Sequence, residues 1–462
     1  MEHQARFGGR LGSSLVAIGA ITRAALEAFL HRLPSQPDDI RSTGIDGPDL
    51  MGLLLRLIYT GRLETLPQFA AAIKLPHPIV GDLVQMAVDR KLLHSLGARG
   101  SSSLSAISYT LTEEGHRWTV DALQRMGYVG PAPVTLTAFT EQVSLQKLTN
   151  EAVPIERIQQ ALTAYTFDES IIEQCGPALN SGRAMLLYGP PGNGKTSLAL
   201  ALSGVFSDII YIPYAILVEG QIIRVFDPSI HRPADKASPE DDDPLSIERR
   251  DIYDQRWVPC RRPFVVAGGE LTLDMLDLRY EPVGRYYEAP LHMKALGGCF
   301  IIDDFGRQLV SPTHLLNRWI VPLESRVDYL KLHTGKSFSI PFEELVIFST
   351  NLEPEDLMDP AFLRRLPYKI EIGAPSVAHY HSIFEKECAR HGLELPTEVF
   401  EAIVQKLQTE KQLELAAYQP RFIVDQVVAS CRFRQQEPRL EPRFVRYALD
   451  NLRVNRRNGH VA

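Results

Sequence analysis

One segment constrains the fold of this chain more than any other, because it joins an apolar run at residues 184–188 to the sequence Gly189-Pro-Pro-Gly-Asn-Gly-Lys195-Thr196. The apolar run predicts a buried strand, and the residues from Thr196 onward predict a helix. The glycines allow backbone N–H groups to turn toward phosphate oxygens, and the helix N-terminus adds its positive end. The segment therefore predicts an α/β fold with a phosphate-binding loop of the Walker A type between a strand and a helix.

Two side chains of this loop have distinct expected roles. Lys195 is expected to reach the β- and γ-phosphates of a bound nucleotide, and Thr196 is expected to bind Mg²⁺. The predicted nucleotide contacts are Gly189, Pro190, Pro191, Gly192, Asn193, Gly194, Lys195, Thr196 and Ser197. The alternative interpretation is a glycine-rich turn that binds no ligand.

A second signature follows the predicted strand Cys299-Phe-Ile-Ile, which ends in Asp303 and Asp304. An apolar strand that ends in two carboxylates is the Walker B pattern. Asp303 is expected to hold Mg²⁺ through water, and Asp304 is expected to polarise the attacking water. The usual residue in the second place is Glu, so the shorter Asp304 predicts slow turnover. The alternative is a strand that ends in two solvated acids.

With these motifs the chain resembles the AAA+ ATPases over about residues 150–460. Residues 345–351 resemble the sensor 1 strand, whose terminal polar residue, here Asn351, positions the attacking water. The segment Gln419-Pro-Arg421 resembles the start of the helix that carries the sensor 2 arginine. For Arg421 the alternative is an ordinary arginine of a helical bundle.

The segment Asp359-Pro-Ala-Phe-Leu-Arg364-Arg365 resembles the arginine-finger segment of the same family. The resemblance implies that one of the two arginines enters the nucleotide site of a neighbouring subunit, and it favours Arg365 over Arg364. The alternative is that both arginines form surface salt bridges.

Within this family the MoxR-like branch is the most similar, on Asp304-Phe-Gly-Arg307, Leu315-Leu-Asn-Arg-Trp319 and a hairpin at residues 327–340. The resemblance implies ATP and Mg²⁺ as cofactors, and ATP hydrolysis coupled to the remodelling or assembly of a macromolecular partner. It also implies a homo-oligomeric ring, with a hexamer favoured, that acts on an unknown protein substrate. The competing interpretation is a DNA-binding regulator whose nucleotide site acts as a slow switch.

The predicted architecture is an AAA+ P-loop core at residues 181–375, with a parallel sheet flanked by helices, followed by a helical lid at residues 376–462. The stretch between Lys195 and Asp303 is much longer than in a minimal core of that family. The excess is placed in an insertion at about residues 219–290. This insertion is the expected substrate-contacting surface, and the alternative is that its aromatic residues form a satellite core.

Three predicted segments precede the core: a linker at residues 34–48, a winged-helix-like domain at residues 49–130 and a connector at residues 131–180. The second of these has the order helix, helix, helix, hairpin, helix. Its third helix would enter a DNA groove, but its polar residues have mixed charges. They are Asp82, Gln85, Asp89, Arg90 and Lys91. Because phosphate contacts need many Lys or Arg side chains, DNA binding is less favoured than protein docking or support of an oligomer.

Residues 1–33 predict a short helical hairpin with a turn at Gly19. Residues 10–33 resemble the N-terminal cyclic di-GMP-binding motif of type II secretion and type IV pilus assembly ATPases. The similar positions are Arg10, Gly12, Leu15, Gly19, Leu26 and Leu30. The closing Gln of that motif is Leu33 here, so weak affinity for cyclic di-GMP is expected. The alternative is an amphipathic hairpin without a ligand.

Composition excludes several other classes of protein. A net charge of −7 argues against a protein that coats nucleic acid. The five cysteines are scattered and form no CxxC pair, so they predict neither a disulfide framework nor a zinc ribbon. No run approaches the roughly 20 apolar residues of a membrane-spanning helix. The expectation is a cytoplasmic protein without a membrane span.

Overall fold

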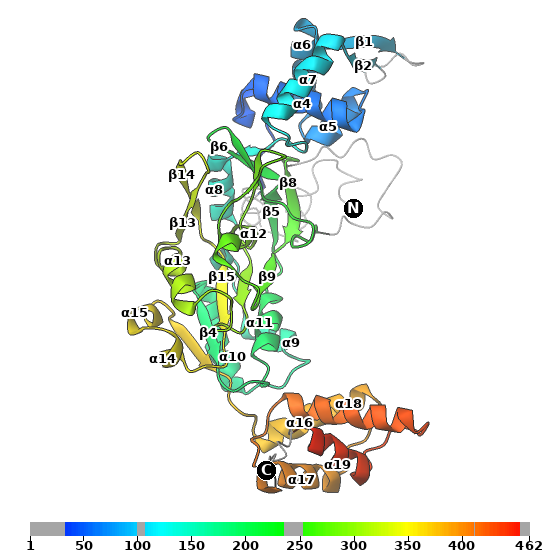
Figure 1. Cartoon of the computed structure of the whole chain (residues 1–462), viewed down its shortest axis with the longest axis vertical. Helices are drawn as coiled ribbons and strands as arrows, with labels where there is room; N and C mark the ends of the chain where they lie inside the picture. The colour runs from blue at the N-terminus through cyan, green and yellow to red at the C-terminus, as the bar shows by residue number, and fades with distance from the viewer. Residues whose placement is uncertain (1–32, 99–106, 235–252, 411, 453–462) are drawn as a thin grey trace, which may run out of the picture.

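The computed structural model describes residues 33–98, 107–234, 253–410 and 412–452. Figure 1 shows an elongated molecule with a helical module near the N-terminus at one end, an α/β core in the middle and a helical bundle at the other end. The hairpin predicted at residues 1–33 lies outside the described residues except for Leu33. The hairpin and its affinity for cyclic di-GMP therefore stay predictions.

The core is built on a five-stranded sheet in which every neighbouring pair of strands is parallel. In spatial order its strands are β16 (Tyr368–Glu371), β4 (Met185–Tyr188), β15 (Leu345–Ser349), β12 (Cys299–Ile302) and β9 (Phe264–Ala267). The first of these strands along the chain, β4, therefore lies between β16 and β15. Because the strands are parallel, the segments that follow them meet at one edge of the sheet, where ligands bind in open α/β folds.

Successive residues of these strands are buried on opposite faces of the sheet. Met185 and Leu187 pack against the helices of one face, whereas Leu186 packs against those of the other. The first face is covered by α9 (Ile155–Ala161), α10 (Glu169–Ser181) and α11 (Lys195–Ser203). The second is covered by α13 (Pro312–Ser325), α14 (Pro354–Leu357) and α15 (Pro360–Leu363). Burial on both faces explains the continuous apolar runs in the sequence, and the predicted α/β fold is confirmed.

A second β region, here called the β unit, sits between the core and the N-terminal module (Figure 1). Its main sheet has the order β10 (Arg279–Glu281), β11 (Tyr286–Glu288), β7 (Gln221–Arg224), β6 (Ala215–Val218) and β3 (Val134–Thr135). The other elements of the β unit are the pair β5 (Ile209–Pro213) and β8 (Trp257–Arg261), the hairpin β13 (Val327–Lys331) and β14 (Ser337–Pro341), and α8 (Leu136–Leu145). One buried apolar cluster joins these elements.

The β unit differs from the single insertion predicted at residues 219–290. It also contains β5, which precedes the predicted range, and β3 and α8, which belong to the predicted connector. Within the predicted range, β9 belongs to the core, because it pairs with β12. The physical reason is that β9 has only four residues, too few for a sequence pattern to separate a core strand from the strands around it.

The N-terminal module contains the predicted succession of three helices, a hairpin and a helix. These are α4 (Gly47–Gly61), α5 (Leu66–Ile73), α6 (His77–Asp89), β1 (Leu93–Ala98), β2 (Ile107–Leu111) and α7 (Glu113–Arg125). Leucines of α4 lie at the centre of its core, and Thr112 caps α7 by accepting a hydrogen bond from the Gly115 N–H. Ala215 and Ile222 of the β unit belong to the same buried cluster, so the module and the β unit share a core.

The predicted linker at residues 34–48 is also packed against the β unit. It contains a short 3-10 helix, η1 (Arg41–Thr43), and Thr43 is buried. Buried Arg256 donates to the Thr43 carbonyl at 3.1 Å and to the Pro133 carbonyl at 3.0 Å. The same guanidinium forms a salt bridge of 2.8 Å with buried Asp254. The composition of the segment suggested a free linker, but these distant residues fix it in place.

We expect Arg256→Ala to lower the free energy of unfolding by about 3–5 kcal/mol, because it leaves the Asp254 carboxylate buried without its partner. Urea unfolding followed by circular dichroism measures the effect. Arg117→Ala is the control, since the pair between Arg117 and Glu114 has side chains that are 75% and 61% exposed. Such an exposed pair is worth about 0.3–0.5 kcal/mol. Equal losses in the two variants would contradict the role given to Arg256.

The lid is a helical bundle with its own core. Its helices are α16 (Val377–Arg390), α17 (Thr397–Gln405), α18 (Tyr418–Phe433) and α19 (Pro442–Asn451), with a π-helical turn η6 (Lys406–Glu410) after α17. Short elements elsewhere are η3 (Leu148–Asn150), η5 (Leu273–Leu276) and α12 (Leu291–Lys294). Among the described helices, none combines the length and the apolar character that crossing a membrane requires.

Candidate functional site

The loop between β4 and α11 needs glycine for two separate reasons. Gly189 and Gly192 have φ of 127° and 83°, which residues with a Cβ rarely adopt. A Cβ at Gly189 would also lie 2.6 Å from the Ile372 carbonyl oxygen. At Gly192 it would lie 2.4 Å from a ring carbon of Tyr418 in the lid. The loop therefore touches both the core and the lid, and it keeps its backbone close to each.

Lys195 is the first residue of α11, and its side chain folds back under the loop. The Nζ atom donates to the carbonyl oxygens of Gly189 and Pro190, each at 2.8 Å. The residue is only 5% exposed. Burial lowers the pKa of the Lys195 ammonium, whereas the charges of Asp304 and Asp303 act in the opposite direction. The loop thus encloses a positive charge within reach of its own backbone.

The next residue, Thr196, connects the loop to β12. Its hydroxyl is 2.9 Å from both carboxylate oxygens of Asp303. A hydroxyl beside a carboxylate is a donor set of the kind that Mg²⁺ prefers, since this ion takes oxygen ligands and usually keeps water and phosphate oxygens as well. The two residues therefore fit a Mg²⁺ site.

Asp304 meets the predicted sensor residue at the ends of two neighbouring strands. The Asn351 amide donates to the Asp304 carboxylate at 2.9 Å. Asp304 itself has φ of 49°, in the left-handed region. Asn351, which follows β15, is thus hydrogen-bonded to Asp304, the second of the two acids that follow β12.

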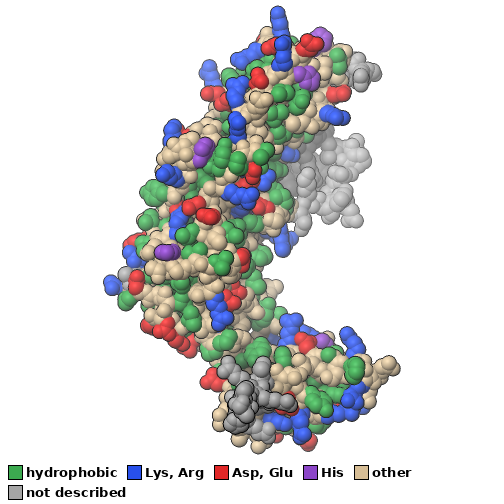
Figure 2. Space-filling model, viewed as in Figure 1, with side chains coloured by type: hydrophobic (Ala, Val, Ile, Leu, Met, Phe, Trp, Pro, Cys, Tyr) green, Lys and Arg blue, Asp and Glu red, His purple; other side chains and the backbone are tan. Residues whose placement is uncertain are grey.

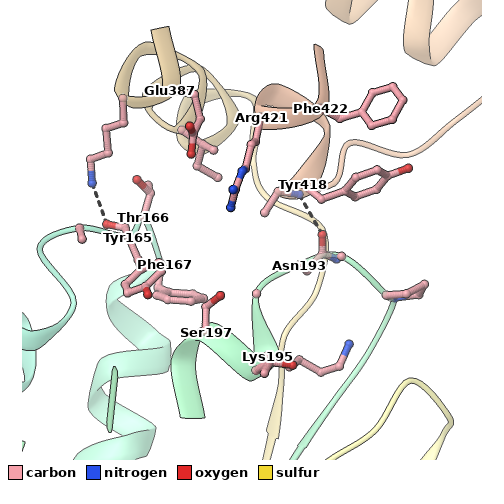
Figure 3. Close-up of a pocket in the computed structure, with 18 of the residues that line it drawn as sticks. Tyr165, Thr166, Phe167, Asn193, Lys195, Ser197, Glu387, Tyr418, Arg421 and Phe422 are labelled. Atoms are coloured by element: carbon pink, nitrogen blue, oxygen red, sulfur yellow. Dashed lines mark hydrogen bonds between the residues drawn. The ribbon is translucent and has the colours of Figure 1, made fainter. Parts of the chain in front are cut away.

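These side chains surround a cavity of about 620 Å³ between the core and the lid. The core side of the lining includes residues 191–197, Asp304 and Asn351. The lid side contributes Lys386, Glu387, Arg390, Tyr418, Arg421 and Asp425. Figure 3 shows Arg421 directed from the lid toward the opening above Lys195. Several cations thus line a space that can accept phosphates.

The lid is held to the loop by hydrogen bonds that the sequence does not reveal. The Tyr418 N–H donates to the Gly192 carbonyl at 2.9 Å, and the Ala417 N–H donates to the Asn193 side chain at 3.2 Å (Figure 3). Lys386 of the lid donates to the Tyr165 carbonyl at 2.7 Å. The position of the lid is therefore linked to the backbone of the glycine-rich loop between β4 and α11.

The segment before α10 forms a wall of the cavity that sequence reasoning missed. The rings of Tyr165 and Phe167 lie 6.1 Å apart, and both line the cavity together with Thr166. The Thr166 hydroxyl oxygen is buried and has no hydrogen-bond partner among the residues that the structure describes. Aromatic rings beside a polar group without a partner fit a flat heterocyclic base. In the sequence, the pair of aromatic residues Tyr165 and Phe167 ahead of β4 is the signal that could have indicated this wall.

The two candidate finger arginines lie away from this cavity, whose lining includes neither of them. Arg364 is exposed at the end of α15. Arg365 forms a salt bridge of 3.2 Å with Glu324 of α13, and the Glu324 side chain is 60% exposed. The structure thus brings together the loop, both acids, Asn351 and Arg421, whereas Arg364 and Arg365 face another part of the surface.

These elements share one arrangement around the sheet and the cavity. A parallel sheet carries the glycine-rich loop after β4 and the paired acids after β12, and the helical lid lines the cavity beside them. The chain has an α/β fold in which a parallel sheet is flanked by helices on both faces.

The chain is similar to one protein family over part of its length and to several solved structures. Residues 376–451, which contain the helices of the lid, match a family described as a domain of unknown function, DUF8689. No curated protein sequence matches the chain.

Among solved structures, the Thermotoga maritima RuvB Holliday junction branch migration motor is similar at 15% identity and a TM-score of 0.35, covering 62% of this chain and 70% of that one. NtrX from Brucella abortus in complex with ADP is similar at 12% identity and a TM-score of 0.36, covering 69% and 62%.

Proposed function

We propose that this chain is an ATPase that binds ATP and Mg²⁺ between the core and the lid, and that couples hydrolysis to the remodelling or assembly of a macromolecular partner. One observation carries the proposal: Lys195, the pair of Thr196 and Asp303, and the pair of Asp304 and Asn351 gather at one edge of the sheet. A purely structural role does not account for a buried lysine beside two carboxylates at the same cavity.

Each of these side chains has a defined task in the proposed reaction. The Lys195 ammonium gives up its hydrogen bonds to the Gly189 and Pro190 carbonyls and binds phosphate oxygens in their place. Thr196 and Asp303 supply oxygen atoms for Mg²⁺, which in turn neutralises charge on the phosphates. Asp304 accepts a hydrogen bond from the attacking water, while Asn351 fixes the orientation of the Asp304 carboxylate. The short side chain of Asp304 favours slow turnover.

The contacts between loop and lid give a route for coupling. Gly192 and Asn193 bind the lid through Tyr418 and Ala417. A change in the loop on ATP binding or phosphate release therefore alters the contacts that hold the lid. Movement of the lid is the step that we propose to act on the partner.

We infer that the working form is a homo-oligomeric ring, with a hexamer favoured. The inference depends on Arg364 and Arg365, which are outside the cavity of their own chain. In a ring they can reach the γ-phosphate in the neighbouring subunit. The similarity to the MoxR-like branch stays an interpretation, based on residues 304–307, 315–319 and the hairpin of β13 and β14.

A protein is the favoured partner. On α6, Asp82 is exposed and Gln85 donates to Asp89 at 2.7 Å, so this helix presents acidic groups where a DNA-reading helix needs cations. Figure 2 shows Lys, Arg, Asp and Glu side chains intermixed on the visible face of the N-terminal module. We place the partner contact on this module or on the β unit to which it is joined.

The experiment is affinity capture with an Asp304→Asn variant, which should bind ATP and hydrolyse it poorly. We expect a protein to be retained by this variant in the presence of ATP and to be lost with Lys195→Ala, the control in which ATP binding should be weakened. The retained protein should then stimulate ATP hydrolysis by the unmodified chain. Stimulation by DNA fragments in its place would support the second candidate, a DNA-binding regulator with a slow nucleotide switch, which the short Asp304 also fits.

A further inference from the structure

The turn after β12 carries both acids, and its backbone is unusual. Asp304 has φ of 49° and Gly306 has φ of 104°, so two of its residues lie in the left-handed region. A residue with a Cβ adopts this region at a cost in free energy, although Asp does so more readily than most. Other contacts must therefore stabilise the turn for the Asp304 carboxylate to stay at the cavity.

One side chain supplies three of these contacts. The Gln308 amide nitrogen donates to the carbonyl of Asp303 at 2.9 Å and to the carbonyl of Asp304 at 3.2 Å. The Gln308 amide oxygen accepts from the Gly306 N–H at 2.8 Å. A single half-buried amide thus satisfies backbone groups on three residues of the turn.

The sensor strand holds the same turn from the opposite side. The Phe305 N–H donates to the Ser349 carbonyl at 2.7 Å, and the buried Thr350 hydroxyl donates to the Phe305 carbonyl at 2.7 Å. The Phe305 side chain is 1% exposed and packs against Phe348. On the other side, the Asp304 carbonyl also accepts from the Arg307 N–H at 3.0 Å. Gln308 is the side chain that joins this carbonyl to the Asp303 carbonyl and to the Gly306 N–H.

We propose that Gln308 is a positioning residue for hydrolysis, which holds the turn so that Asp304 faces the attacking water. The proposal rests on the proposed ATPase function and adds a residue to it. Gln308 is not part of the cavity lining, so it acts through Asp304. The amide is required because the position needs a donor and an acceptor together: a Glu keeps the acceptor but loses both donors, and an Ala has neither.

The test compares steady-state ATP hydrolysis by the unmodified chain, Gln308→Ala and Gln308→Glu. We expect kcat to fall by about 10–100-fold in both variants, since a small misplacement of a catalytic group is enough for such a loss. KM and the Kd for a non-hydrolysable ATP analogue should stay within about twofold. Leu309→Ala is the matched control, because Leu309 is the next residue and is 83% exposed; its kcat should not change.

A double variant separates positioning from a general structural effect. If Gln308 acts only through Asp304, the Gln308→Ala, Asp304→Asn double variant should be no slower in single-turnover hydrolysis than Asp304→Asn alone. The proposal would be overturned if the losses in rate of the two single variants multiplied in the double variant. It would also be overturned if Gln308→Ala raised the Kd for the ATP analogue by the same factor by which it lowered kcat. If the unmodified chain hydrolyses ATP and Gln308→Ala matches it, only this inference fails. If the unmodified chain does not hydrolyse ATP, the proposed function and this inference fail together.

Discussion

Lys195→Ala is expected to reduce ATP hydrolysis by about 10²–10³-fold, because removal of one preorganised group that stabilises transition-state charge has that effect in other enzymes. ATP binding should weaken as well, since Lys195 is the cation enclosed by the phosphate-binding loop. The measurements are phosphate release and titration with a fluorescent ATP analogue. Normal turnover by this variant would contradict the proposal that Lys195 belongs to a nucleotide-binding site.

The same substitution has a structural cost that the sequence did not suggest. Lys195 is buried, and its removal leaves the carbonyls of Gly189 and Pro190 without a donor. We expect a loss of about 1–2 kcal/mol in the free energy of unfolding, because buried acceptors lose their partner. This is small beside the usual stability of a domain, so the variant should remain folded. Lys331→Ala, on the exposed side of the hairpin, is the matched control and should retain full activity.

The grouping of the candidate site residues could be predicted largely because these residues are encoded in short local patterns. Lys195 and Thr196 follow a strand and its glycines directly, and Asp303 and Asp304 end another strand. In a parallel sheet the ends of neighbouring strands meet, so local patterns at separate places in the chain converge without further information. The contact between Asn351 and Asp304 follows from the same geometry.

The β unit could not be predicted in the same way. Its sheet contains β3, which has two residues, and β10 and β11, which have three each. Strands this short show no clear period, and here they pair with partners that are far away in the sequence. Apart from Arg421, the cavity residues of the lid were missed for a related reason: the contact between Tyr418 and Gly192 depends on how the lid packs on the core.

Arg365→Ala is expected to bind ATP normally and to hydrolyse it about 10³–10⁵-fold more slowly, the range found where arginine fingers have been dissected. The reason is that neither Arg365 nor Arg364 lines the cavity of its own chain. The salt bridge between Arg365 and Glu324 does not prevent this role. The Arg365 and Glu324 side chains are 28% and 60% exposed, and an ion pair in contact with solvent is worth about 0–1 kcal/mol, so we expect the guanidinium to exchange Glu324 for a phosphate.

The decisive measurement is complementation between two inactive variants. In a mixture of Arg365→Ala and Lys195→Ala subunits, some interfaces join an intact nucleotide site to an intact arginine, and these should restore part of the activity. Arg364→Ala is the matched comparison, since Arg364 is the exposed neighbour on the same segment. If Arg364→Ala loses hydrolysis and Arg365→Ala does not, the finger is Arg364, and the pair with Glu324 fixes the segment that carries it. Full activity from an isolated monomer would show that the site needs no residue from a neighbouring subunit, and it would contradict the proposed homo-oligomeric ring.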